Sequence, residues 1–190
     1  MQQIVTTVLQ RIQILSDLGN QPILIAIDGR CASGKTTLAA MLQQICGCNV
    51  IHMDHFFLRP EQRTAERMRY PGSNVDYERF QSEVMIPLQQ NREFSYCPYN
   101  CRMQKLDAPV CVQQNKICII EGAYSCRPEL IENYALKIFL TTAKEEQLCR
   151  IERRNGKESV QAFVEKWIPM EENYIEAFEI EKRCDFIFET

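Results

Sequence analysis

Eight residues near the start of the chain, Gly29 to Thr36, match the pattern G-x-x-x-x-G-K-[ST]. Glycines at two positions let the backbone curl so that successive N–H groups face one anion. Lys35 can reach the β- and γ-phosphates of a nucleoside triphosphate, and the Thr36 hydroxyl can ligate magnesium. The pattern therefore predicts a phosphate loop, or P-loop, for ATP and Mg²⁺. The residues expected to contact the nucleotide are Gly29, Arg30, Cys31, Ala32, Ser33, Gly34, Lys35, Thr36 and Thr37.

Two carboxylates follow short apolar runs that are typical of buried strands. Asp54 comes directly after residues 49–53, and Glu121 ends the run that starts at Lys116. In an open α/β sheet, ligands collect at the carboxyl ends of the strands. Asp54 is therefore predicted to accept the proton of an attacking hydroxyl, and Thr36, Asp54 and Glu121 are predicted to hold magnesium. Two alternatives stay open: Asp54 as a helix N-cap, and Glu121 as a solvated strand end.

Positive charge gathers late in the chain, in R-I-E-R-R-N-G-K at residues 150–157. Phosphoryl transfer spreads negative charge over the equatorial oxygens, and a mobile arginine-bearing lid can stabilise that charge and exclude water. Arg150, Arg153 and Arg154 are therefore predicted to act with Lys35 in catalysis, from a lid over about residues 150–158. The alternative is a solvated helix end that carries cations near its C-terminus.

Strands that alternate with helices are expected to position these groups. Apolar spacing predicts an amphipathic helix over residues 3–18 and further helical segments, the last with a kink at Pro169. This alternation predicts a mostly parallel five-stranded sheet with helices on both faces, a three-layer α/β fold. The expected strands are 22–27, 49–53, 116–121, 136–140 and 185–189, and the expected helices are 36–45, 76–88, 143–154 and 160–178.

Composition narrows the class of protein. The 190 residues carry a formal charge of -3, so no basic excess favours nucleic acid as a partner. No apolar run approaches the roughly 20 residues that cross a bilayer, and the first residues lack the positive charge of a signal peptide. We therefore expect a cytoplasmic protein with no membrane partner. Ten cysteines are present, but their spacing is poor for structural zinc, and a cytosolic chain keeps its thiols reduced.

Taken together, these segments resemble the uridine kinase / phosphoribulokinase family of P-loop kinases. The matching segments run in order from about residue 22 to 189: G-R-C-A-S-G-K-T-T, M-D-H-F-F-L, N-V-D-Y-E-R-F, I-I-E-G-A-Y, R-I-E-R-R-N-G-K and the closing E-E-N-Y-I-E-A-F-E-I-E-K-R-C-D-F-I-F. The resemblance implies a nucleoside/nucleotide kinase-like P-loop NTPase fold. It also implies Asp54 as the catalytic base and Glu121 as the carboxylate associated with magnesium.

The same resemblance implies residues for the phosphoryl acceptor. Asp76 falls where relatives bind the ribose hydroxyls, with a helix N-cap as its alternative role. Tyr99 is also assigned to the substrate, although Tyr99-Asn100 stands where uridine kinases carry Tyr-Asp. The chain is short for a uridine kinase, which predicts little room for a hairpin that covers the substrate.

The sequence thus predicts a single P-loop kinase domain over residues 1–190, able to form a homo-oligomer. It is expected to transfer the γ-phosphoryl group of ATP to a hydroxyl of a small metabolite, a nucleoside such as uridine being favoured. One alternative is another acceptor, such as nicotinamide riboside, pantothenate or a sugar. The other is a nucleotide-binding regulatory module without transfer activity, although such a module needs neither Asp54 nor an arginine lid.

Overall fold

A central sheet of five parallel strands organises the protein. The structure, a computed structural model, describes residues 1–19 and 22–190. The strand order is β2-β7-β1-β8-β9, and every pair in this sheet is parallel. The strands are β1 (Ile23–Gly29), β2 (Asn49–His52), β7 (Ile117–Glu121), β8 (Leu136–Thr141) and β9 (Phe186–Glu189). The five-stranded sheet predicted from the sequence is confirmed, and each strand lies within two residues of its expected bounds.

Side chains of the central strand β1 alternate between two cores. Ile23, Ile25 and Ile27 belong to one buried cluster, and Leu24 and Ala26 belong to the other. All seven residues of β1 are buried, as expected for a strand covered on both faces. Helices α1 (Gln2–Asp17) and α2 (Lys35–Cys46) supply the first cluster.

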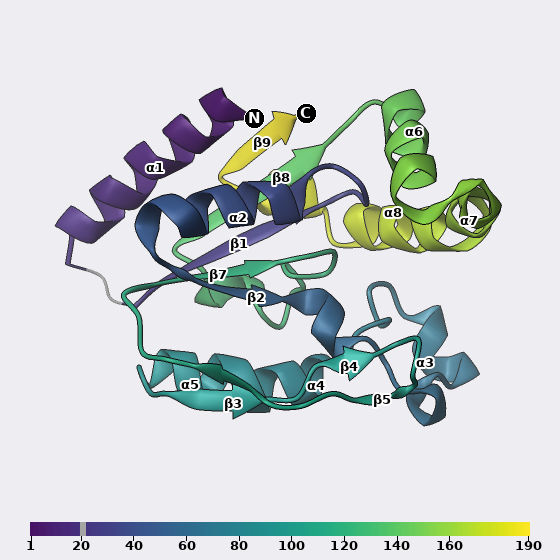
Figure 1. Cartoon of the computed structure of the whole chain (residues 1–190), viewed down its shortest axis with the longest axis horizontal. Helices are drawn as coiled ribbons and strands as arrows, with labels where there is room; N and C mark the ends of the chain where they lie inside the picture. Colours follow the sequence, from purple (N-terminus) through teal and green to yellow (C-terminus); the bar gives the residue numbers. More distant parts are fainter. Residues whose placement is uncertain (20–21) are drawn as a thin grey trace.

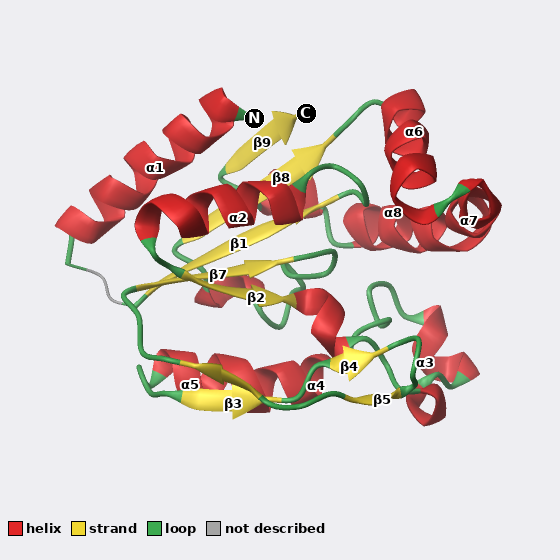
Figure 2. Cartoon of the chain, in the orientation of Figure 1, coloured by secondary structure: helices red, strands yellow, loops and turns green. Residues whose placement is uncertain are grey.

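The second cluster lies on the opposite face of the sheet (Figures 1 and 2). It draws on the helical run α4 (Tyr77–Phe80), η3 (Gln81–Met85) and α5 (Ile86–Gln89), and on α8 (Ile168–Ala177) and α9 (Ile180–Arg183). The predicted three-layer α/β arrangement is thus confirmed. The remaining helices are η1 (Met53–Phe56), η2 (Pro60–Gln62), α3 (Ala65–Arg69), η4 (Ile131–Asn133), α6 (Lys144–Asn155), α7 (Lys157–Ala162) and η5 (Phe163–Trp167).

Both long helical runs contain a π-helical turn directly before a proline. The turn η3 is followed by Ile86-Pro87, and η5 is followed by Ile168-Pro169. A proline ring collides with the carbonyl four residues earlier in an α-helix, and the wider π turn relieves that collision. The irregularity predicted at Pro169 is therefore present, and it begins one turn earlier.

Between α5 and β7 the chain forms two short antiparallel pairs that the sequence did not predict. β3 (Phe94–Tyr96) pairs with β6 (Val110–Val112), and β4 (Tyr99–Asn100) pairs with β5 (Lys105–Leu106). The expectation of little room for a hairpin was therefore wrong. Strands of two or three residues are too short to show a period-two pattern.

Two further expectations concern the whole chain. No helix in residues 1–19 and 22–190 is long and apolar enough to cross a bilayer. The single domain over residues 1–190 and the cytoplasmic location stay predictions.

Candidate active site

The phosphate loop connects β1 to the first turn of α2. Gly29 has φ +135° and packs so closely on β8 that a Cβ atom there would collide with the Leu140 carbonyl oxygen. Ala32 and Gly34 also adopt left-handed backbone, with φ of +59° and +90°. Such curled backbone turns N–H groups toward one point, and the first N–H groups of α2 add the positive end of a helix. The loop can therefore bind an anion of phosphate size.

Lys35 lies across this loop. Its Nζ donates to the carbonyl oxygens of Gly29 at 2.7 Å and Arg30 at 2.8 Å. The Oγ of Ser33 is buried and has no hydrogen-bond partner in the part of the chain that the structure describes. A charged amine beside the loop and an unpaired hydroxyl within it suit the phosphates of a nucleotide.

Helix α8 contacts the phosphate loop directly through two carboxylates. Glu171 accepts a hydrogen bond from the Cys31 N–H at 2.8 Å, and burial raises the pKa of the Glu171 carboxyl. Arg30 donates to both carboxylate oxygens of Glu172, at 2.7 and 2.9 Å, and to Glu181 at 2.7 Å. The Arg30 side chain thus points toward α8 and α9, so its part in nucleotide binding is to hold the loop in shape.

A second buried carboxylate supports the base of the loop. Asp28 accepts from the N–H groups of Gly29 and Cys126 and from the Tyr174 hydroxyl, at 2.7, 2.8 and 2.7 Å. Burial raises the pKa of Asp28, and these three donors oppose that shift because they stabilise the ionised form. The end of β1, the loop after β7 and α8 are therefore joined at one carboxylate.

Thr36 and Glu121 meet at the carboxyl edge of the sheet, as the sequence predicted. The Thr36 hydroxyl lies 3.2 and 3.3 Å from the two Glu121 oxygens. His52 Nδ1 lies 2.5 Å from Glu121 Oε1, and this hydrogen bond raises the pKa of the imidazole because the carboxylate stabilises its charged form. Asp54 lines the same cavity as this pair, and all three residues offer oxygen donors of the kind that Mg²⁺ prefers. The described residues contain no cluster of three acidic, histidine or cysteine side chains, so these donors fit a magnesium ion that is also held by phosphate oxygens and water.

Asp54 lies in η1, directly after β2. Its side chain is exposed to the solvent of the cleft although protein surrounds it on the other sides. This crowding raises the pKa of the Asp54 carboxyl, the negative charge of Glu121 raises it further, and Lys35 opposes both. A carboxylate with a raised pKa is better matched to accept a proton near neutral pH than a free aspartate.

The three predicted lid arginines are all on α6, whose last residue is Asn155. Arg150 is tethered: it donates to the carbonyl oxygen of Ala32 at 3.3 Å and to Thr190 at 2.9 and 3.0 Å. Arg153 and Arg154 are exposed, and their hydrogen bonds go to neighbours on their own segment, Cys149 and Asn155. Of the three arginines predicted for the lid, Arg150 is thus held at the phosphate loop, and the side chains of Arg153 and Arg154 are exposed.

One cavity of about 1160 Å³ brings most of these side chains together. The arginines of α6 lie on the side of the phosphate loop, where Arg150 bonds to Ala32, and Asp54 and Glu121 also line the cavity. Arg63, Asn74, Phe57 and Cys101 form its far end. The predicted site residues that line it are Cys31, Ala32, Gly34, Lys35, Thr36, Thr37, Asp54, Glu121, Arg150, Arg153 and Arg154.

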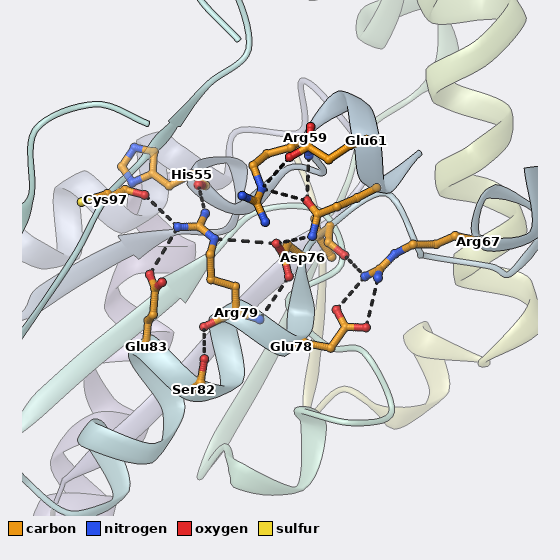
Figure 3. A network of polar contacts seen from close by, with 12 residues as sticks. His55, Arg59, Glu61, Arg67, Asp76, Glu78, Arg79, Ser82, Glu83 and Cys97 are labelled. Carbon is orange, nitrogen blue, oxygen red and sulfur yellow. Dashed lines mark hydrogen bonds and ion pairs between the residues drawn. The ribbon is translucent and has the colours of Figure 1, made fainter. Parts of the chain in front are cut away.

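Asp76 and Tyr99, the two residues predicted for the acceptor, do not line this cavity. Asp76 caps α4: its carboxylate accepts from the Arg79 N–H at 3.1 Å (Figure 3). It also accepts from the Gln62 side chain at 2.6 Å. Tyr99 lies on β4 and is buried, and its hydroxyl has no partner among the residues that the structure describes. The structure therefore places Asp76 in the capping role, and its contact with an acceptor stays a prediction.

Solved structures show which fold this arrangement belongs to. A possible uridine kinase from Bacillus stearothermophilus is similar with a TM-score of 0.69 at 21% identity, over 96% of this chain and 99% of that chain. The chain has the fold of the P-loop kinases. A candidate fructose transport system kinase from Silicibacter sp. TM1040 has a TM-score of 0.63 at 22% identity, over 88% and 90% of the two chains. No protein-family model matches the chain, and no curated protein matches it.

The resemblance drawn from the sequence is thus confirmed at the level of the fold. Within this P-loop kinase fold, the cavity also uses residues that the sequence reading missed: Arg63, Asn74, Tyr124, Trp167 and Glu171. Glu171 carried a signal, since it begins the segment E-E-N-Y that supplied part of the resemblance. Arg63 carried none, because it lies in a polar stretch with no periodicity.

Proposed function

We propose that this protein is an ATP- and magnesium-dependent kinase that phosphorylates a hydroxyl group of a small metabolite. One observation carries the proposal: a single cavity joins the phosphate loop, the Thr36–Glu121 pair, Asp54 and two exposed arginines. A phosphate-binding module needs only the first of these. The combination supplies a binding site, a proton acceptor and charge stabilisation at one place.

Each group has a distinct role in the transfer. The acceptor oxygen forms a bond to the γ-phosphorus of ATP, the bond from that phosphorus to the bridging oxygen of ADP breaks, and the acceptor proton passes to Asp54. Lys35 stabilises the β- and γ-phosphates, and Arg153 or Arg154 approaches the transferred group. Thr36 and Glu121, together with Asp54, would hold Mg²⁺, which neutralises charge on the phosphates when it is bound.

The acceptor that the sequence favours is a nucleoside such as uridine. Nicotinamide riboside, pantothenate and sugars are the other acceptors of the same class of reaction. A nucleotide-binding regulatory module is the rival outside that class. Asp54 argues against the rival, because a carboxylate in this cavity can accept the acceptor's proton, whereas its negative charge only weakens simple phosphate binding.

Acceptor-dependent release of ADP tests the proposal. A panel of nucleosides, vitamins, sugars and hydroxy acids is mixed with ATP, Mg²⁺ and the full chain, and ADP is measured. At least one acceptor should raise the rate well above the background hydrolysis of ATP. No rise with any acceptor, together with tight ATP binding by calorimetry, would favour the regulatory module.

The variant Lys35→Ala should lose both nucleotide affinity and turnover, because it removes the charge aimed at the β- and γ-phosphates. Lys105→Ala is the matched control, since Lys105 is exposed on β5 and does not line the cavity. Unchanged affinity and turnover in Lys35→Ala would contradict the assignment of the phosphate loop.

A further inference from the structure

The far end of the cavity, beyond Asp54, presents a guanidinium group with a free edge. This end is formed by the chain after β2, and its cation is Arg63. The arginines of α6 come from the opposite side of the cleft, since α3 and α6 lie far apart (Figure 1). Arg63 therefore lies apart from the charges that serve the phosphates of ATP.

The backbone holds the Arg63 guanidinium in place. Its Nε and Nη2 both donate to the carbonyl oxygen of Leu58, at 3.0 and 2.8 Å. Leu58 is fully buried, and its own N–H donates to the Asn74 carbonyl oxygen at 3.1 Å. One edge of the guanidinium is thus fixed to a packed segment, so little side-chain entropy remains to be lost when a ligand binds.

The other edge, Nη1 and Nη2, is available. Within residues 1–19 and 22–190, Arg63 has no ion pair and Nη1 has no hydrogen bond. Two parallel N–H donors of this kind match the two oxygens of a carboxylate or of a phosphate group. A guanidinium binds a neutral hydroxyl less well, because the hydroxyl carries no negative charge to offset the positive charge of the guanidinium.

The surroundings favour an anion over a ribose. Asp76, the residue that the sequence predicted for ribose hydroxyls, is held outside the cavity by Gln62 and by the first turn of α4. The carboxylates that line the described cavity are Asp54, Glu121 and Glu171; Glu121 is paired with Thr36 and Glu171 with the Cys31 N–H. Beside Asp54, the far end of the cavity thus offers Arg63, Asn74 and the Cys101 thiol, and Arg63 is the charged group among these three.

Arg63 and Asp54 line the same cavity. The Arg63 guanidinium is bonded to the carbonyl oxygen of Leu58, which is only four residues along the chain from Asp54. A hydroxyl placed at Asp54 therefore leaves the rest of a small molecule near Arg63.

We infer that the acceptor is an anionic hydroxy compound, with a carboxylate or phosphate group that binds the Nη1–Nη2 edge of Arg63 while its hydroxyl lies at Asp54. This inference rests on the proposed function and narrows its acceptor class. It moves the expected acceptor away from a neutral nucleoside.

Matched pairs of compounds test the charge directly. Calorimetry on the full chain, with Mg²⁺ and a non-hydrolysable ATP analogue bound, compares ribose 5-phosphate with ribose, and gluconate with sorbitol. The first pair probes a phosphate group and the second a carboxylate. At least one charged member should bind about tenfold or more tightly than its neutral partner.

Substitution of Arg63 locates the effect. Arg63→Gln should remove the preference for the charged member, and Arg63→Lys should restore only part of it, because an ammonium group lacks the fork. Affinity for the ATP analogue should not change in either variant. Arg69→Gln is the control, since Arg69 is exposed on the adjacent α3 and does not line the cavity.

The outcomes separate this inference from the proposed function. Equal binding of charged and neutral members, no binding of either charged probe, or a preference that survives in Arg63→Gln would overturn the inference. Turnover of neutral acceptors alone would do the same and leave the kinase assignment in place. A charge preference that depends on Arg63, without ADP release for any acceptor, would support the anion site and contradict the kinase.

Discussion

At the scale of single residues, Asp54 determines how the rate should depend on pH. Only its ionised form can accept a proton, and crowding and the charge of Glu121 raise its pKa. The ionised fraction therefore falls as pH drops through this raised pKa, and kcat/KM should fall about tenfold for each further pH unit. This decrease in kcat/KM should begin at a higher pH than it would for a free aspartate. Above the raised pKa, Asp54 is ionised and should cause no further change in the rate.

The variant Asp54→Asn should lower kcat by roughly 10²- to 10⁴-fold, the usual contribution of a general base. The acid limb of the pH profile should disappear with it. Calorimetry should show ATP affinity nearly unchanged, because Lys35 and the loop backbone remain. A variant that keeps its kcat and its acid limb would show that another group accepts the proton.

Residue identity and spacing reveal a phosphate loop well and an acceptor site poorly. Gly29, Lys35 and Thr36 act through local backbone geometry, which eight consecutive residues determine. Arg63 and Asn74 reach the cavity only because Phe57 pairs with Val75 in an isolated bridge and closes the chain between them into a loop. Contacts of this kind depend on tertiary packing, so spacing along the sequence does not predict them.

At the scale of elements, α6 carries arginines with two different settings. Arg150 is bonded to Ala32 and Thr190, whereas Arg153 and Arg154 are exposed and bonded only within their own segment. At least one of the variants Arg153→Ala and Arg154→Ala should lower kcat by about 10³-fold if that arginine contacts the transferred group. Arg150→Ala should instead raise KM for ATP, because Arg150 holds the phosphate loop.

Steady-state kinetics on the three variants, with ATP and acceptor varied separately, measures this division. Arg183→Ala serves as a control, since Arg183 is on α9 and does not line the cavity. Wild-type kcat in both Arg153→Ala and Arg154→Ala would make these arginines surface charge only, which is the alternative that the sequence left open.

Helix α8 stabilises the phosphate loop partly through Tyr174. Its buried hydroxyl donates to Asp28 at 2.7 Å, so Tyr174→Phe should lower the free energy of unfolding by about 1–3 kcal/mol. A chain of this size should lose roughly 2–4 °C in Tm for each kcal/mol. Tyr70→Phe is the control, because Tyr70 is 54% exposed.

The loss in Tyr174→Phe should also depend on pH. Tyr174 stabilises the ionised form of Asp28, whose pKa is raised by burial. The variant raises that pKa further, so its extra destabilisation is present above the raised pKa and shrinks as pH falls below it. Denaturant unfolding at neutral and acidic pH measures the difference. An equal loss at every pH would show that the hydroxyl does not act through the charge of Asp28.

The sequence predicted the elements whose periodicity extends over several residues. The five strands of the sheet and the helices around residues 3–18 and 36–45 are present within two residues of their expected bounds. The pairs β3–β6 and β4–β5 were not predicted, because strands of two or three residues show no measurable periodicity. Tyr99 belongs to one of these pairs and is buried, which its assignment to the substrate did not anticipate.

At the scale of the whole molecule, the cavity lies between two groups of elements, which also touch each other where Gly72 packs against Tyr174 and Tyr70 against Phe178. One group is the chain after β2, with η1 and α3; the other is α6, α7, η5 and α8 (Figure 1). Arg30, Glu171 and Glu172 tie α8 to the phosphate loop, so a ligand on the loop acts on the second group directly. Binding of ATP should therefore change the surroundings of the side chains on η5.

The only tryptophan of the chain, Trp167, is the last residue of η5 and lines the cavity. Its ring lies 4.5 Å from the Lys166 ammonium, so its emission should respond when charge or solvent near η5 changes. Titration of ATP and Mg²⁺ should shift or quench this emission with a saturation curve that matches the Kd from calorimetry. Lys35→Ala should show no change at the same ATP concentration, and Trp167→Phe should remove the signal while binding persists. If calorimetry detects ATP binding and the emission of Trp167 stays constant, then the cavity wall formed by η5 does not respond to the nucleotide, and the group of α6 to α8 is a fixed wall instead of a lid.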